Sequence, residues 1–116
     1  MEAYKRVEAA RAKGRPSGRD YVDNIIDGFL EMHGDRRFGD DGAIVAGVGW
    51  LRDMPVTVIA IDRGRDTKEK LRRNFGCAHP EGYRKALRQM HLAEKFHRPV
   101  ICFVDTAGAY CGIEAE

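Results

Sequence analysis

The sequence has few of the features that mark secreted or membrane-spanning proteins. It holds three cysteines, Cys77, Cys102 and Cys111, and no two have the spacing of a zinc knuckle or a Cys-x-x-Cys redox site. A disulfide framework is therefore not expected, and reduced thiols are typical of cytosolic proteins. No apolar run approaches the roughly 18 residues of a membrane span, and the first residues lack the apolar core of a secretory signal. We expect a cytoplasmic protein with no membrane contact.

The chain also lacks a large excess of charge of either sign. Its 20 Lys and Arg stand against 18 Asp and Glu, which gives a formal net charge of +2. This balance excludes a whole-chain polycation but leaves room for a local basic patch. Apolar residues make up 43% of 116 residues, enough for one domain with a core and too many for obligatory disorder. Because the sequence stops within a glycine-containing loop, we expect it to be part of a longer protein.

Two helices are predicted at the start of the chain. Residues 2–13 have a helical pattern with few apolar positions, so residues 1–16 are expected to form a separate helical segment. Ser17 precedes Asp20 by three residues, which is a capping pattern for a second helix. Apolar residues at helical spacing then carry this helix to near Gly34.

The rest of the chain alternates strands and helices. Residues 43–51 and 55–61 are rich in Val and Ile and are separated by three residues, which predicts an antiparallel hairpin. The second strand hardly alternates, so both its faces are expected to be buried. A helix over 81–97 and a buried strand over 99–105 follow, and they predict a right-handed βαβ unit. The fold class is therefore α/β.

A basic segment covers residues 63–73. Six cations, Arg63, Arg65, Lys68, Lys70, Arg72 and Arg73, are offset there only by Asp66 and Glu69. One interpretation is a self-paired surface helix in which Glu69 reaches Arg72 or Arg73. The other is a site for phosphate or carboxylate, which guanidinium groups bind in bidentate fashion. Nucleic acid is a weaker third choice, because the segment lacks interleaved aromatic residues.

A loop of small residues follows the last predicted strand. In open α/β sheets ligands bind at this edge, and small residues let backbone N–H groups approach an oxyanion. The candidates are Gly108, Ala109, Tyr110 and Gly112, with an ordinary turn as the alternative. The four histidines share no ligand spacing, so no metal site is expected. A Cys–His nucleophile at Cys111 stays open, although nothing supplies its base.

Several long strings resemble one known family, the carboxyltransferase α subunits of bacterial acetyl-CoA carboxylase. The resemblance covers about residues 19–116 in a single register. The strings are HGDR at 33–36, DD at 40–41, AIV at 43–45, RGRDTKEK at 63–70, RRNFG at 72–76, PEGYRKALR at 80–88, FVDT at 103–106 and GAY at 108–110.

The resemblance implies a crotonase-like fold of stacked ββα units, of which residues 17–116 would be one part, truncated at the C-terminus. It implies transfer of a carboxyl group from carboxybiotin on a carrier protein to acetyl-CoA, giving malonyl-CoA for fatty-acid synthesis. The implied partners are a carboxyltransferase β subunit with a zinc ribbon in an α2β2 assembly, the biotin carboxyl carrier protein and biotin carboxylase. No cofactor is expected to bind this chain directly, and ATP binding belongs to the whole complex.

For the site, the resemblance places the main oxyanion-hole amides beyond residue 116, so no catalytic residue is assigned here. It leaves the loop at 108–112 as a neighbour of the substrate. The candidates for contact with an anion, CoA or a partner are Arg63, Arg65, Lys68, Arg72 and Arg73.

Three departures from the family pattern are expected to affect the loop. The family usually has proline where Ala107 and Cys111 stand, and loss of proline is expected to loosen the loop. It usually has glycine where the bulkier Glu114 stands. The alternative function is a catalytically inactive relative that binds a partner or polyanion. An unpaired sheet edge further predicts self-association.

Overall fold

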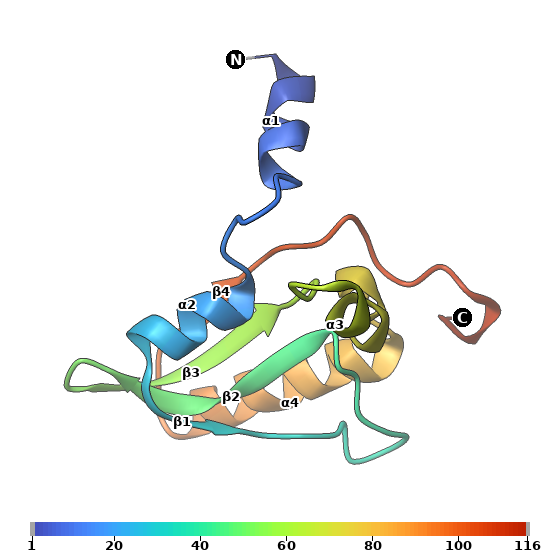
Figure 1. Ribbon diagram of the computed structural model, residues 1–116. Coiled ribbons are helices and arrows are strands. Elements are labelled where there is room, and N and C mark those ends of the chain that lie inside the picture. The colour runs from blue at the N-terminus through green and yellow to red at the C-terminus, as the bar shows by residue number, and fades with distance from the viewer. Residues whose placement is uncertain (1, 116) are drawn as a thin grey trace.

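A four-stranded sheet organises residues 2–115, the part of the chain that the computed structural model describes. The strands lie side by side in chain order, with β1 against β2 and β2 against β3 antiparallel, and β3 against β4 parallel (Figure 1). Their bounds are β1 Asp27–Glu31, β2 Ile44–Leu51, β3 Met54–Ile61 and β4 Val100–Phe103. The α/β class, the hairpin and the parallel return strand are confirmed.

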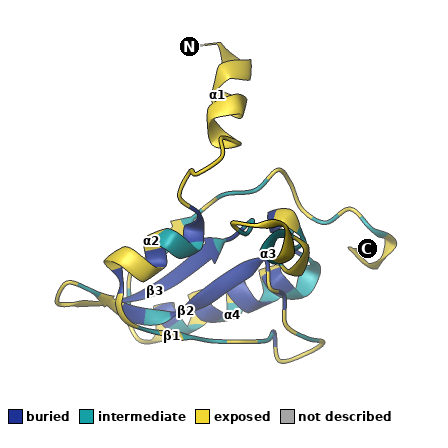
Figure 2. Cartoon of the chain, viewed as in Figure 1, coloured by how far each residue is buried: buried dark blue, intermediate teal, exposed yellow. Residues whose placement is uncertain are grey.

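Within residues 2–115, α-helices and short 3₁₀ turns precede, connect, cover or follow the strands. Their bounds are α1 Ala3–Ala10, α2 Gly18–Ile25, α3 Thr67–Arg72, η1 Asn74–Gly76, α4 Pro80–Lys95 and η2 Ile113–Ala115. Helix α1 buries none of its residues and projects from the body of the protein (Figures 1 and 2). No helix within residues 2–115 is long and apolar enough to cross a membrane.

The two central strands are buried on both faces. One cluster joins Val22 and Ile26 to alternate residues of β2 and β3, and it includes Val45 and Val58. The second cluster joins Ile44 and other alternate residues of the same strands to Ala86 of α4 and its neighbours. Figure 1 shows α2 and α4 on opposite sides of the sheet. Because strand side chains alternate between faces, this double cover explains the continuous apolar pattern of β3.

The prediction of one long helix from Ser17 to near Gly34 is wrong in its second half. The Ser17–Asp20 capping box forms as expected. However, the chain leaves the helix at Ile26, which has φ −109° and ψ 117°, and continues as strand β1. Strand β1 pairs with the edge of β2 that β3 leaves open. The side chain of Ile26 still packs in the core, although its backbone is extended. Pairing with β2 thus overrides the helical spacing of the apolar residues.

The predicted burial of the last strand is also wrong. Strand β4 is shorter than 99–105 and alternates between exposed and half-buried residues. It lies at the edge of the sheet, where β3 is its single neighbour within the described residues. Its other edge remains open, so self-association through this edge stays a prediction.

A buried lysine ties α4 to the loop before β2. Lys85 is 1% exposed, and its Nζ donates to Asp40 Oδ1 at 2.6 Å and to the Asp41 carbonyl at 2.8 Å. Asp40 also accepts from the Gly34 N–H. Burial acts to raise the pKa of Asp40, but the bonds from Lys85, Gly34 and His33 outweigh it and lower this pKa to about 2.

Asp40→Asn is expected to lower the free energy of unfolding at pH 7 by about 1–2 kcal/mol, because it leaves the buried Lys85 ammonium without an opposite charge. The folded-state pKa lies below the unfolded one, so this contribution is complete above about pH 4 and is lost as the pH falls toward 2. Urea unfolding at both ends of this range measures the difference. The exposed Asp53→Asn is the control, and an equal loss at both pH values would contradict the assignment.

Candidate functional site

The parallel pairing of β3 with β4 brings two distant segments to one edge of the sheet. Strand β3 ends at Ile61 and β4 ends at Phe103, with Ala60 paired to Phe103. The basic segment therefore starts beside the small-residue loop, although about forty residues separate them in the chain. This carboxyl edge is where α/β sheets bind their ligands.

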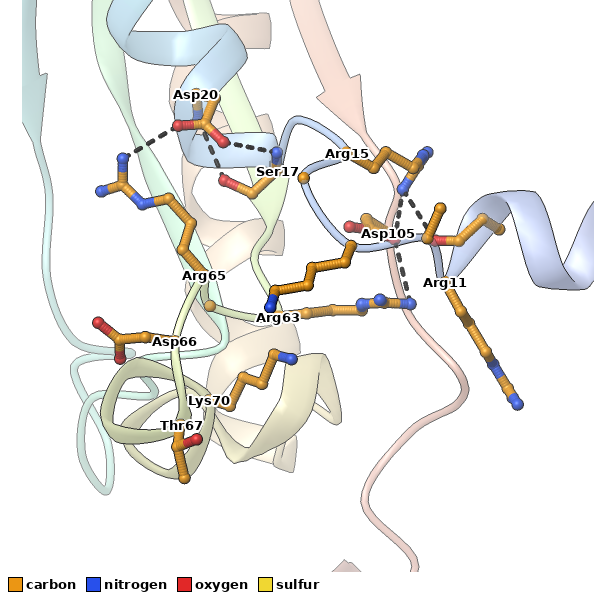
Figure 3. A pocket seen from close by; sticks show the side chains of 15 residues that line it. Arg11, Arg15, Ser17, Asp20, Arg63, Arg65, Asp66, Thr67, Lys70 and Asp105 are labelled. Carbon is orange, nitrogen blue, oxygen red and sulfur yellow. Dashed lines mark hydrogen bonds and ion pairs between the residues drawn. The ribbon is translucent and has the colours of Figure 1, made fainter.

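One carboxylate joins three segments at this edge. The side chain of Asp105 is 14% exposed, and its Oδ1 lies 3.1 Å from Arg15 Nη1 and 3.7 Å from Arg63 Nη1. Figure 3 shows the two guanidinium groups converging on it. Arg15 also donates to the Ala10 carbonyl at the end of α1. Asp105 thus connects the N-terminal segment, the basic segment and the loop.

Arg73 belongs to the scaffold and is not free to bind a ligand. Its Nε lies 2.9 Å from Asp62 Oδ2, and both side chains are largely buried. Its Nη1 donates to the Gly42 carbonyl at 2.7 Å. The predicted pairing of Glu69 with Arg72 or Arg73 is therefore wrong. Asp62 holds the Arg73 guanidinium, and no ion pair within residues 2–115 joins Glu69 to Arg72.

Glu69 pairs instead with Arg65. The Arg65 N–H donates to Glu69 Oε2 at 3.1 Å, and Arg65 Nη1 lies 3.0 Å from Asp20 Oδ1. The hydrogen bond to Glu69 raises the pKa of Arg65, while the Arg65 backbone N–H is the main cause that lowers the pKa of Glu69. Asp66 caps α3 by accepting from the Glu69 N–H at 2.8 Å. Self-pairing thus describes this part of the segment.

The structure divides the predicted cation set between two cavities. Arg63 and Arg65 line a cavity of about 670 Å³ with the N-terminal segment. Arg65 also lines a second cavity of about 500 Å³, together with Arg72 and Arg73. Lys68 lines neither one, whereas Lys70, which the candidate set omitted, lines the first.

Three cations of the first cavity were missed from the sequence. They are Arg11, Lys13 and Arg15. Arg11, Lys13 and Arg15 stand about fifty residues before the basic segment, and only the folded chain brings them beside it.

The small-residue loop is held at two points. Thr106 Oγ1 donates to the Gly76 carbonyl at 2.7 Å and accepts from the Gly108 N–H at 3.0 Å. Further along, the Tyr110 N–H donates to the Ala78 carbonyl at 3.1 Å. The amides of Gly108 and Tyr110 are thus already engaged, whereas the Ala109 residue between them is exposed.

Tyr110 closes the far side of the loop. Its ring stacks on His79 with centroids 4.1 Å apart, and its hydroxyl donates to Glu114 Oε2 at 2.8 Å. This bond raises the pKa of Tyr110 and lowers that of Glu114. Gly112 lies so close to the Tyr110 ring that a Cβ would collide with it. Glu114 therefore adds a contact to the loop.

A cavity of about 540 Å³ opens beside the loop. Most of the side chains that line it are aromatic or charged, and the lining consists of Phe38, His79, Pro80, Glu81, Arg84, Tyr110 and Glu114. The Asp35 carboxylate accepts three backbone N–H groups around Phe38 and a bond from Arg84 Nε, and the Phe38 N–H is the main cause of its lowered pKa. Asp35 thus holds both Arg84 and the backbone around Phe38 in place at this cavity.

The sequence also led to predictions about metal binding and about the cysteine thiols. Within residues 2–115, no group of three or more His, Cys, Asp or Glu side chains could hold a metal ion. Cys77 is half-buried, and Cys102 and Cys111 are exposed as free thiols.

Sequence comparison matches the chain to a known family over its full length. The family described as "Acetyl co-enzyme A carboxylase carboxyltransferase-like" matches residues 1–116, a longer stretch than the 19–116 expected. The acetyl-coenzyme A carboxylase carboxyl transferase subunit alpha of Ruminiclostridium cellulolyticum is 69% identical over all of this chain and 45% of its own length. A Clostridium tetani protein named as subunits beta/alpha of the same enzyme is 55% identical over all of this chain and 20% of its own length. The chain spans less than half of these relatives.

Solved structures share the fold at low identity. Transcarboxylase 12S, with methylmalonyl-coenzyme A and methylmalonic acid bound, matches 96% of this chain and 23% of its own, with a TM-score of 0.70 and 22% identity. The β subunit of Pseudomonas aeruginosa geranyl-CoA carboxylase matches 96% of this chain and 21% of its own, with a TM-score of 0.66 and 22% identity. The expected crotonase-like fold is confirmed.

Thr106→Val is expected to loosen the loop without disturbing the sheet, because it keeps the side chain's shape and removes the hydroxyl that joins Gly76 to Gly108. The exchange rate of the Gly108 amide should rise about five- to tenfold, as expected for the loss of one hydrogen bond. Hydrogen exchange followed by NMR measures it, with the amides of β2 and β3 as the internal control. An unchanged Gly108 rate would show that Thr106 does not hold the loop.

Proposed function

Because the chain belongs to the acetyl-CoA carboxylase carboxyltransferase family, we propose that it forms the N-terminal part of a subunit that transfers a carboxyl group from carboxybiotin to acetyl-CoA. The observation that carries this proposal is the loop after β4, which is anchored by Thr106 and Tyr110 beside a partly aromatic cavity. A cavity of about 540 Å³ with ring-bearing walls suits a planar ureido ring.

The reaction requires stabilisation of two oxyanions. The acetyl-CoA methyl group loses a proton to give an enolate, and the carboxyl carbon leaves the biotin nitrogen as the new carbon–carbon bond forms. The biotin nitrogen takes up a proton, which leaves malonyl-CoA and biotin. Backbone N–H groups suit both the enolate and the ureido oxygen, because they are fixed dipoles that need no change of protonation.

This chain's part in the reaction is to shape and orient the site. The Gly108 and Tyr110 amides are used inside the protein, so they hold the loop in place and do not donate to substrate. The main oxyanion-hole donors come from chain beyond residue 116. Residues 17–116 are accordingly one part of a carboxyltransferase domain, and residues 1–16 are a separate helical segment.

The assembly belongs to the same proposal. The chain's subunit pairs with a carboxyltransferase β subunit in an α2β2 assembly, which holds two copies of this subunit, and it receives carboxybiotin from the biotin carboxyl carrier protein. Biotin carboxylase, on another subunit, uses the ATP. The complex supplies malonyl-CoA to fatty-acid synthesis in the cytoplasm.

A chimera tests this function directly. Residues 1–116 replace the matching segment of the R. cellulolyticum subunit, with which they share 69% identity, and the chimera is combined with that organism's β subunit. The kcat/KM for malonyl-CoA-dependent carboxylation of biocytin is expected to stay within about tenfold of that of the parent enzyme. This limit corresponds to a change of about 1.4 kcal/mol in the activation free energy. The 116-residue chain itself is expected to be inactive with the β subunit.

A substitution in the loop of the chimera tests whether the activity depends on the loop. Gly112→Val in the chimera is expected to lower kcat/KM by more than about tenfold, because its side chain cannot fit against the Tyr110 ring. A folded, β-bound chimera with no turnover would contradict the proposal and favour the inactive, partner-binding alternative. Full activity of the unextended chain would contradict the assignment of the oxyanion donors to later residues.

A further inference from the structure

We propose that the cavity between the N-terminal segment and the basic segment binds a diphosphate group. This site includes Arg63 and Asp105 and is separate from the cavity beside Tyr110. The proposal does not depend on the proposed carboxyl transfer. The cavity measures about 670 Å³ and is lined by residues 10–15, the start of α2, residues 63–67 and Lys70 of α3, and Asp105. Its size is in the range of small-molecule sites.

Cations outnumber anions two to one in its lining. The cations are Arg11, Lys13, Arg15, Arg63, Arg65 and Lys70, and the carboxylates are Asp20, Asp66 and Asp105. All three carboxylates already have partners inside the protein. Asp20 accepts from Ser17 and Arg65, Asp66 caps α3, and Asp105 faces Arg15 and Arg63.

Three of the cations have no such partner. Arg11, Lys13 and Lys70 form no ion pair or side-chain hydrogen bond within residues 2–115, and the Arg63 contact with Asp105 is long at 3.7 Å. Figure 3 shows the Lys70 side chain rising from α3 toward Arg63. Like charges that face one cavity without a counter-charge repel each other, so a bound anion would remove an existing cost.

The chemistry of the lining favours phosphate over other anions. Arginine presents a planar fork that matches two oxygens of one phosphate, and lysine adds a compact charge that can serve the next phosphate. The excess of three positive charges in the lining matches the charge of a diphosphate better than that of one carboxylate. The lining holds no aromatic side chain, so base stacking of a nucleic acid has no platform here.

Binding at this site would also hold the N-terminal segment against the body. Arg11 and Lys13 belong to that segment, while Arg63 and Lys70 belong to the body. Helix α1 buries no residue, so the Arg15 bonds to Ala10 and Asp105 are its main described attachment near the cavity. An anion shared by both sides adds a second attachment.

Titration of this chain with pyrophosphate, CoA and pantetheine, followed by calorimetry, tests the site. Pyrophosphate and CoA share the diphosphate, and pantetheine lacks phosphate. We expect the first two to bind and pantetheine not to bind. Tighter binding of CoA than of pyrophosphate would identify a nucleotide-linked diphosphate, and equal affinity would identify the free anion. Failure of both phosphate compounds to bind would overturn the proposal, and it would leave the carboxyl-transfer assay of the chimera unaffected.

Two pairs of charge reversals locate the site. Lys70→Glu should weaken binding at least about tenfold, as expected for loss of a charge-assisted contact, and Lys68→Glu on the same helix should change it less than about twofold. Arg6→Glu within α1 and Arg11→Glu directly after it form the second pair, and α1 has no buried residue to disturb. Equal weakening by Lys68→Glu and Lys70→Glu, or by Arg6→Glu and Arg11→Glu, would overturn the cavity as the site.

Discussion

The rest of the structure depends on the parallel pairing of β3 with β4. A parallel pair needs a long crossover, and here residues 62–99 supply it, with α3, η1 and α4 on the way. Because both strands run the same way, each ends at the same edge, and an aspartate stands within two residues of each end. Asp62 is neutralised by Arg73, and Asp105 by Arg15 and Arg63. Two neighbouring carboxylates thus organise the arginines of the basic segment instead of repelling each other.

Asp105 and Thr106 are adjacent residues at this edge, and each contacts a different part of the protein. On one side the Asp105 carboxylate holds the N-terminal segment beside a cationic cavity. On the other, Thr106 ties the loop to Gly76, at the end of a turn whose three residues all have positive φ. Such backbone is costly for Asn74 and Phe75, and it persists where surrounding contacts require it. The turn places the Gly76 carbonyl within reach of Thr106 and lets Gly76 pack against Arg63.

Local patterns in the sequence predicted the elements that depend on local interactions. The Ser17 capping box, the β2–β3 hairpin and α4 formed as expected, and the quoted strings led to the right family and fold. Strand β1 was missed because an apolar helical pattern cannot reveal that β2 needs a partner. The role of Arg15, the pairing of Arg73 with Asp62 and the Tyr110–Glu114 bond depend on long-range or loop geometry. Charge counting alone could therefore find the basic segment but not which of its cations remain free.

One carboxylate, that of Asp105, couples the N-terminal segment, the basic segment and the loop. Hydrogen exchange across the whole Asp105→Asn chain tests this coupling most directly, since the amide keeps the side chain's shape and loses the charge that holds Arg15 and Arg63. If Asp105 couples the three segments, exchange rises together in residues 10–17, 63–66 and 104–110, while β2 and β3 stay protected. A rise confined to residues 10–17, or no rise at all, would contradict it.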